Sequence, residues 1–189
     1  MFTFATTNKN KIKEMRVLFP EGFQTLADFP HFQIEPADET GSTFEENAID
    51  KARDYAATLK VPILAEDSGL EVFALEDAPG VRSQRVSDDK IGWLLDKMKG
   101  FRVVREARYV SVMVFMPDYK SDLFIVSRGE QYGLIALKPR GKNGFDYDPL
   151  FLPEGYDSMT LGEISLEDKC KISHRAMAMK AMRKYLVEA

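Results

Sequence analysis

The segment from Thr6 to Lys11 has the composition of an anion-binding loop. It lies between a predicted strand over residues 2–6 and a predicted helix over residues 12–19. Free backbone N–H groups and the helix dipole favour an anion at such a position, and Lys9 and Lys11 add positive charge. The segment lacks the glycines and the Lys-Ser/Thr ending of a Walker A loop. An ordinary solvated turn capped by Asn8 is the alternative interpretation.

Two acidic segments carry the oxygen donors that a hard cation prefers. Asp38 and Glu39 precede a predicted helix, and Glu66 and Asp67 end an apolar run over residues 61–65. Adjacent carboxylates at the end of a buried strand repel each other, and a divalent cation would offset this repulsion. Acidic residues before a helix also complement its dipole, so the first segment has an ordinary explanation too.

Residues 141–149 form a loop punctuated by glycines that carries two aromatic rings and two carboxylates. Phe145 and Tyr147 offer ring faces to a nucleobase, and Asp146 and Asp148 offer acceptors to its edge or to the sugar. Aromatic residues in loops more often fill a core, which is the competing interpretation.

Residues 169–175 place cations at the start of the last predicted helix. Ser173 is the expected N-cap, and His174 and Arg175 lie in the first turn. Cations at a helix N-terminus oppose the dipole, so their presence favours a bound anion or a polar ligand edge beside them. A surface His-Arg pair is the ordinary alternative.

Strands and helices alternate along the chain. Apolar runs predict strands over residues 2–6, 61–65, 70–75, 109–116 and 123–126, and apolar periodicity predicts helices over residues 12–19, 43–59, 91–98 and 173–186. Thr43 and Glu46 have the spacing of a capping box. The alternation predicts an α/β fold on a mixed sheet, with residues 1–189 forming a single domain.

Bulk properties exclude several classes of function. The chain has 189 residues, a net charge of −4 and one cysteine, Cys170. This charge gives no general attraction to nucleic acid or to anionic membranes, and a lone cysteine cannot form an intrachain disulfide. We find no secretory signal and no apolar stretch of about 20 residues. We therefore expect a cytoplasmic protein that binds neither nucleic acid nor membrane.

Taken in order, these segments resemble the inosine/xanthosine triphosphate pyrophosphatase family. The matching segments are Thr6–Lys11, Glu39, Glu66–Leu70, Ala78–Ser83, Phe145–Pro149 and Ser173–Arg175. The resemblance implies a long twisted mixed β-sheet with flanking helices that form two lobes around a nucleotide-binding cleft. It also implies a homodimer that hydrolyses ITP, dITP and XTP to the monophosphate and pyrophosphate.

The resemblance further implies roles for individual residues. Glu39 and Asp67 would hold Mg²⁺, and Asp67 would also accept a proton from the attacking water. The implied substrate contacts are Thr6, Thr7, Asn8, Lys9, Asn10, Lys11, Lys51, Ser68, Phe145, Asp146, Tyr147, Asp148, Lys169, His174 and Arg175.

Three departures from the family pattern bear on specificity and assembly. Thr7 and Asp146 replace common glycines, and residues 86–88 replace a common Y-A-G or Y-S-G. The shortened stretch from Val86 to Trp93 lies where family members often contribute to dimerisation. Asp146 adds a negative charge and a Cβ beside the expected base pocket.

Two other functions remain open at this point. A Maf-like pyrophosphatase would share the architecture but act on other nucleotides. A nucleotide-binding sensor would hold the triphosphate without cleaving it.

Overall fold

The computed structural model describes residues 1–32, 39–156 and 158–187. Its strands are β1 (Thr3–Phe4), β2 (Gln24–Thr25), β3 (Ile63–Val72), β4 (Glu106–Met116), β5 (Ile125–Ile135) and β6 (Phe151–Pro153). Its α-helices are α1 (Lys9–Leu18), α2 (Phe44–Leu59), α3 (Lys90–Lys97), α4 (Leu166–Ile172) and α5 (His174–Val187). Short 3-10 helices are η1 (Leu26–Asp28), η2 (Phe73–Leu75) and η3 (Gly80–Arg82).

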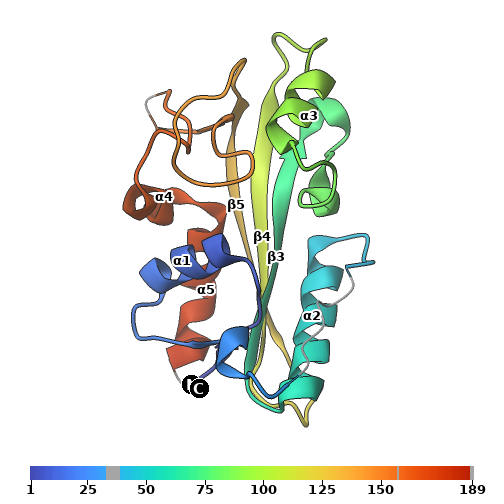
Figure 1. Cartoon of the computed structure of the whole chain (residues 1–189), viewed down its shortest axis with the longest axis vertical. Coiled ribbons are helices and arrows are strands. Elements are labelled where there is room, and N and C mark those ends of the chain that lie inside the picture. Colours follow the sequence, from blue (N-terminus) through green and yellow to red (C-terminus); the bar gives the residue numbers. More distant parts are fainter. Residues whose placement is uncertain (33–38, 157, 188–189) are drawn as a thin grey trace.

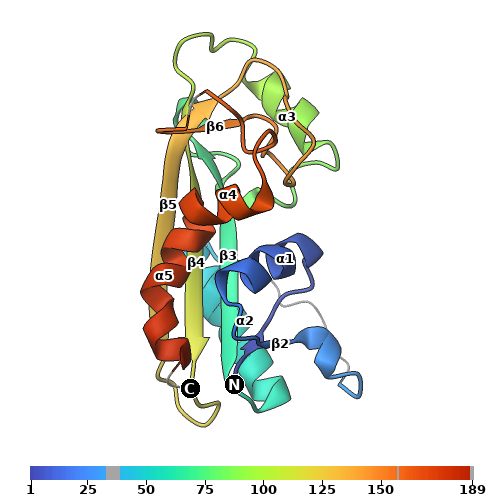
Figure 2. The same cartoon turned by 90° about the vertical axis from the view of Figure 1, so that its left-hand side faces the viewer.

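One mixed sheet runs the length of the molecule, as expected for this fold class. Its strand order is β2-β1-β3-β4-β5-β6. The short strand β1 is parallel to both β2 and β3, whereas β3 to β6 pair antiparallel. In Figure 1, α1, α4 and α5 lie on one side of this sheet, and α2 and α3 lie on the other. The N-terminus and the end of α5 lie at one end of the sheet, and α3 and β6 lie at the opposite end (Figure 2).

Alternation along β3 and β4 creates two cores on opposite faces of the sheet. Ile63 and Ala65 pack with α2, whereas Leu64 packs with α1 and α5. The capping box is confirmed, because Thr43 Oγ1 accepts from the Glu46 backbone N–H and the Glu46 carboxylate accepts from the Thr43 N–H.

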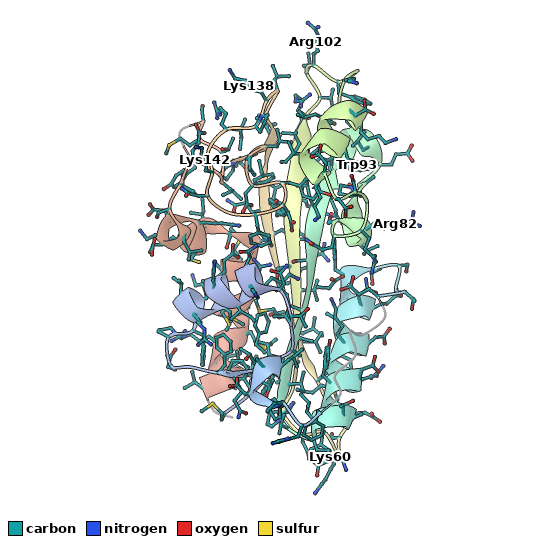
Figure 3. The ribbon with its side chains drawn as sticks, viewed as in Figure 1. Lys60, Arg82, Trp93, Arg102, Lys138 and Lys142 are labelled. Atoms are coloured by element: carbon teal, nitrogen blue, oxygen red, sulfur yellow. The ribbon has the colours of Figure 1, made fainter. Side chains whose placement is uncertain are left out.

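A third core lies at the end of the sheet that carries α3. Leu94 of α3 packs with Tyr147 and Leu150 of the loop that precedes β6. Figure 3 labels Trp93 on α3 and Lys142 on this loop. The third core therefore joins α3 to the loop predicted to hold the base.

The expectation of two strands around Glu66 and Asp67 is wrong. Residues 63–72 form one continuous strand, and residues 73–75 form η2 rather than its extension. The acidic pair therefore lies in the middle of β3 and not at its end. Helix α4 was not predicted, although Ser165 caps it by accepting from the Asp168 N–H at 3.0 Å.

Candidate active site

The candidate site surrounds β3 where its neighbour β1 ends. Strand β1 pairs with only two residues of β3, Ile63 and Leu64, and the chain then turns away into the segment that starts α1. Side chains from both faces of β3 can therefore meet beyond this short strand. Burial lowers the pKa of Lys11, and the charges of Lys51 and Arg175, from opposite faces of the sheet, lower it further.

Glu66 and Asp67 point to opposite faces of the sheet, because side chains alternate along a strand. Glu66 lies with Arg175 and Ser111 on the α5 face, and Asp67 lies with Asn47 and Lys51 on the α2 face. The expectation that the two carboxylates repel each other and share one cation is therefore wrong. Each is neutralised by its own cationic partner.

Lys51 of α2 joins the two predicted metal ligands. Its Nζ lies 2.8 Å from Glu39 Oε1 and 2.9 Å from Asp67 Oδ1. Asn47, one turn earlier on α2, donates from Nδ2 to Asp67 Oδ2 at 3.1 Å. Helical spacing thus places an amide and an ammonium on one carboxylate.

Arg85 completes the surroundings of Glu39. It donates from Nη1 to Glu39 Oε2 at 2.6 Å, and from Nη2 to the Val81 carbonyl at 3.2 Å. Burial alone would raise the pKa of Glu39, but Lys51 and Arg85 more than offset this effect and lower it. Glu39 is therefore an anion under ordinary conditions. Asp38, beside it, lies outside the described residues.

Arg175 is a buried cation between two carboxylates on the other face. Its Nε lies 2.9 Å from Glu66 Oε1, its Nη1 donates to Glu14, and its Nη2 donates to Ser68 Oγ at 3.2 Å. Burial opposes the ionised form of Glu66, yet Arg175 and Lys11 hold the pKa of its carboxyl well below its usual range. Carboxylates of the protein itself therefore neutralise the charge of Arg175 at the start of α5.

Glu14 is the central residue that the sequence analysis missed. Its carboxylate accepts from Arg175 and lies 2.7 Å from Lys169 Nζ. It follows Lys11 by three positions, so the two share one face of α1. This spacing is the sequence signal that could have identified Glu14 as a site residue. Lys11 itself lies 3.6 Å from Glu66 Oε2 and is 6% exposed, which makes it a buried lysine rather than a surface one.

Lys169 links this buried network to the 141–149 loop. Its Nζ lies 2.5 Å from Asp148 Oδ2 and 4.5 Å from the centre of the Phe145 ring. The Phe145 ring is half-buried and faces this ammonium. Asp148 also accepts from the Phe145 N–H at 2.7 Å. Lys169, which was predicted from the sequence to bind substrate, therefore anchors this loop.

Tyr147 behaves as a core residue in this structure. It is 1% exposed, and its hydroxyl donates to the Ser83 carbonyl at 2.9 Å. The alternative interpretation of this aromatic as a residue that fills the core therefore describes its position, and Phe145 is the more exposed of the two rings.

His174 is a neutral buried imidazole. Its ring stacks on Tyr109 with centroids 4.7 Å apart, and its Nδ1 has no hydrogen-bond partner among the described residues. Burial, Arg175 and Lys169 all lower its pKa well below the ordinary value. His174 also lines a pocket, and a buried ring nitrogen without a partner is uncommon enough to suggest a ligand contact.

The Thr6–Lys11 segment forms the turn capped by Asn8 that was its alternative interpretation, and its role in anion binding stays a prediction. Asn8 caps α1 by accepting from the backbone N–H groups of Asn10 and Lys11, at 2.9 and 3.2 Å. Thr7, Lys9 and Asn10 are exposed around this cap, whereas Lys11 points inward. The cap uses two of the N–H groups that the anion hypothesis relies on.

Glu39 and Asp67 are the pair best placed for a divalent cation. No group of three or more His, Cys, Asp and Glu side chains in the described ranges is placed to hold a metal ion. However, Mg²⁺ often uses only one or two carboxylates, with waters and substrate phosphates completing its shell. One oxygen of each carboxylate already approaches the same ammonium, so the donor set fits one Mg²⁺ near Lys51.

Comparison with known proteins agrees with this architecture. The chain matches the model of the Ham1 family over residues 2–185. It is 41% identical to a dITP/XTP pyrophosphatase of Elusimicrobium minutum, across 95% of this chain and 96% of the relative. It is 42% identical to one of Deinococcus radiodurans, across 94% and 88% respectively.

Solved structures give the same result. A HAM1 protein from Coxiella burnetii is 35% identical with a TM-score of 0.87, and the match covers 100% of this chain and 98% of that one. The Ham1 protein of Staphylococcus aureus is 35% identical with a TM-score of 0.82, covering 100% and 99%. The similarity of sequence and of fold extends across nearly the whole chain, and the protein belongs to the Ham1 family.

Proposed function

We propose that this chain hydrolyses non-standard purine nucleoside triphosphates, namely ITP, dITP and XTP, to the monophosphate and pyrophosphate. The relatives named dITP/XTP pyrophosphatase support this substrate class. The observation that carries the reaction type is the convergence of Glu39 and Asp67 on Lys51, since it joins hard oxygen donors to a buried cation. That combination suits a triphosphate and its metal ion.

In this proposal Glu39 and Asp67 would hold Mg²⁺. When bound, the ion neutralises charge on the phosphates and on the pyrophosphate leaving group. Lys51, which lies between these two carboxylates, would also bind a phosphate oxygen. Asp67 would accept the proton of the attacking water, with Asn47 fixing the orientation of its carboxylate.

The phosphates would lie against α1 and β3. Lys11, Lys51 and Lys169 supply positive charge, Ser68 supplies a hydroxyl, and residues 6–10 supply backbone and side-chain donors. Lys169 already contacts Asp148 and Glu14, and its ammonium has a third N–H for a phosphate oxygen.

The base would enter between Phe145 and the wall formed by His174 and Tyr109. Phe145 supplies a ring face, and His174, whose Nδ1 has no hydrogen-bond partner among the described residues, would read the base. This wall would be supported from the protein interior by the buried residues Tyr147, Asp148 and Arg175. A carbonyl at C6 accepts a hydrogen bond where adenine presents an amino group, which favours 6-oxo purines when the reader is a donor.

We also propose that the chain forms a homodimer in the cytoplasm and that residues 1–189 fold as one domain. A groove of about 680 Å³ is lined by exposed Phe73, Tyr132 and Leu134 and offers an apolar surface to a second copy. Cys170 is buried and free, as suits a reducing compartment. No helix in the described segments has the length and apolar character needed to span a bilayer. Light scattering would measure the assembly.

A panel of triphosphates tests the proposed activity. We expect kcat/KM for ITP, dITP and XTP to exceed that for ATP and for pyrimidine triphosphates by at least about a hundredfold, because an unpaired polar group in the pocket is costly. Equal turnover of pyrimidine nucleotides would favour a Maf-like specificity. Tight binding without turnover would favour a sensor, and either result would contradict the proposal.

A further inference from the structure

Asp146 joins the two walls of the pocket predicted to receive the base. Its Oδ1 lies 3.3 Å from Lys90 Nζ, and its Oδ2 accepts a hydrogen bond from Gln84 Nε2. Gln84 follows η3 and Lys90 is the first residue of α3, whereas Asp146 lies on the 141–149 loop. We refer to these two contacts as the Asp146 bridge.

The Asp146 bridge lies at the pocket and not elsewhere on the surface. Gln84 and Asp146 line the pocket together with Phe145, His174 and Arg175. The pocket has about 10 Å³ of free volume, which is roughly what one water molecule needs. Pockets for small molecules are far larger, at about 300–1,000 Å³. A purine ring therefore cannot enter while the two walls stay in this position.

Asp146 adopts a backbone conformation that is unfavourable for most residues with a side chain, and the Asp146 bridge offsets this conformational free energy. Asp146 has φ of 52°, in the left-handed region that favours glycine. Its ion pair with Lys90 is only partly exposed, with the Lys90 and Asp146 side chains 19% and 15% accessible, so solvent screens it incompletely. The hydrogen bond from Lys169 to Asp148 is a second anchor of the same loop.

We propose that the Asp146 bridge is a closure device that holds the base pocket shut and must open before a purine nucleotide binds. This inference rests on the proposed function, because it assigns the base to this pocket. A closed state that excludes the ligand lowers apparent affinity by the fraction of molecules that are open. Gln84, Lys90 and Asp146 are thus positioning residues that set nucleotide affinity without touching the phosphates.

Binding of IMP, measured by calorimetry, tests the proposal without turnover. Asp146→Gly removes the carboxylate and suits the positive φ, and Lys90→Met removes the cation but keeps most of the side chain. We expect each to lower the Kd for IMP about three- to tenfold. Asp146→Asn, which tolerates the same backbone and keeps an acceptor for Gln84, should show a smaller decrease. The double variant Lys90→Met/Asp146→Gly should bind no tighter than Asp146→Gly alone, because both changes remove the same ion pair.

Matched controls separate closure from general effects. Lys97→Met changes an exposed lysine at the other end of α3 and should leave the Kd for IMP unchanged. Pyrophosphate has no base, so its Kd should be the same in all variants. Thermal unfolding of each variant shows that the fold is retained.

The outcomes distinguish this proposal from the proposed function. An unchanged Kd for IMP in both Lys90→Met and Asp146→Gly would overturn closure, and so would a higher Kd, because the bridge would then stabilise the bound state. In either case the wild type would still bind IMP and cleave ITP. A wild type that binds pyrophosphate but neither IMP nor ITP would refute the proposed substrate class, and the closure proposal with it.

Discussion

Replacing Arg175 with methionine tests the most densely charged part of the structure. The guanidinium is 1% exposed and contacts the carboxylates of Glu14 and Glu66 together with Ser68 Oγ. Methionine keeps much of the volume but supplies no donor. Both carboxylates would then lose one cationic partner, although Glu14 keeps Lys169 at 2.7 Å.

The expected loss of stability follows from the burial of Glu66. Breaking a buried ion pair by removing one partner costs about 3–5 kcal/mol, since the other charge stays buried and uncompensated. For a chain of this size, that corresponds to a decrease in Tm of about 6–20 °C. Lys11, 3.6 Å from Glu66, supplies the remaining positive charge there and places the loss nearer the lower limit.

Urea denaturation followed by circular dichroism gives the free energy of unfolding for this comparison. Arg175→Met, Glu66→Gln and the double variant form a cycle. We expect the double variant to be more stable than the sum of the single losses predicts, by about 0.5–3 kcal/mol, because a neutral amide at position 66 leaves no buried charge without its cation. A loss below about 1 kcal/mol in Arg175→Met, or strict additivity, would refute this description of the network.

The site supports three further predictions. Asp67→Asn should abolish turnover of ITP while retaining the fold, and near wild-type turnover in a pure preparation would remove Asp67 from its role. His174→Asn should lower kcat/KM for ITP by about five- to tenfold and that for ATP less, through loss of about one hydrogen bond; equal losses would place base reading elsewhere. The pKa of His174 is lowered in the fold, so below pH ~6.5 the unfolded chain binds a proton that the folded chain does not. Stability should therefore fall as pH falls, by up to about 1.4 kcal/mol per pH unit, and His174→Asn should flatten this dependence when unfolding is measured between pH ~7.5 and ~5.5.

Periodicity and capping signals predicted the helices α1, α2, α3 and α5 and the strand β4, but they predicted only the start of β5. Only residues 123–126 were expected as a strand there, yet β5 runs to Ile135. Gly129 and Gly133 weaken the strand signal. A Cβ at Gly129 would lie 2.1 Å from the His174 carbonyl oxygen, and one at Gly133 would lie 2.2 Å from that of Leu152. Close approach of α5 and β6 requires these glycines, and such tertiary contacts leave no local pattern in the sequence.

The candidate site, like the fold, was predictable from the sequence only in part. The residue types at Glu39, Lys51 and Asp67 were predictable, and the structure brings them together. The partners of Arg175 were not, because Glu14 and Glu66 lie 161 and 109 positions away in the chain. The alternation that separates Glu66 from Asp67 was predictable in principle, but only once both residues are assigned to the interior of one strand.

The central claim is that water attacks the α-phosphorus of a non-standard purine triphosphate and releases pyrophosphate. Hydrolysis of ITP in heavy-oxygen water, with the products separated early in the reaction and analysed by mass spectrometry, tests it most directly. The account predicts IMP and pyrophosphate as the first products, with the heavy oxygen in IMP. Initial release of IDP and orthophosphate, or heavy oxygen in pyrophosphate, would contradict it.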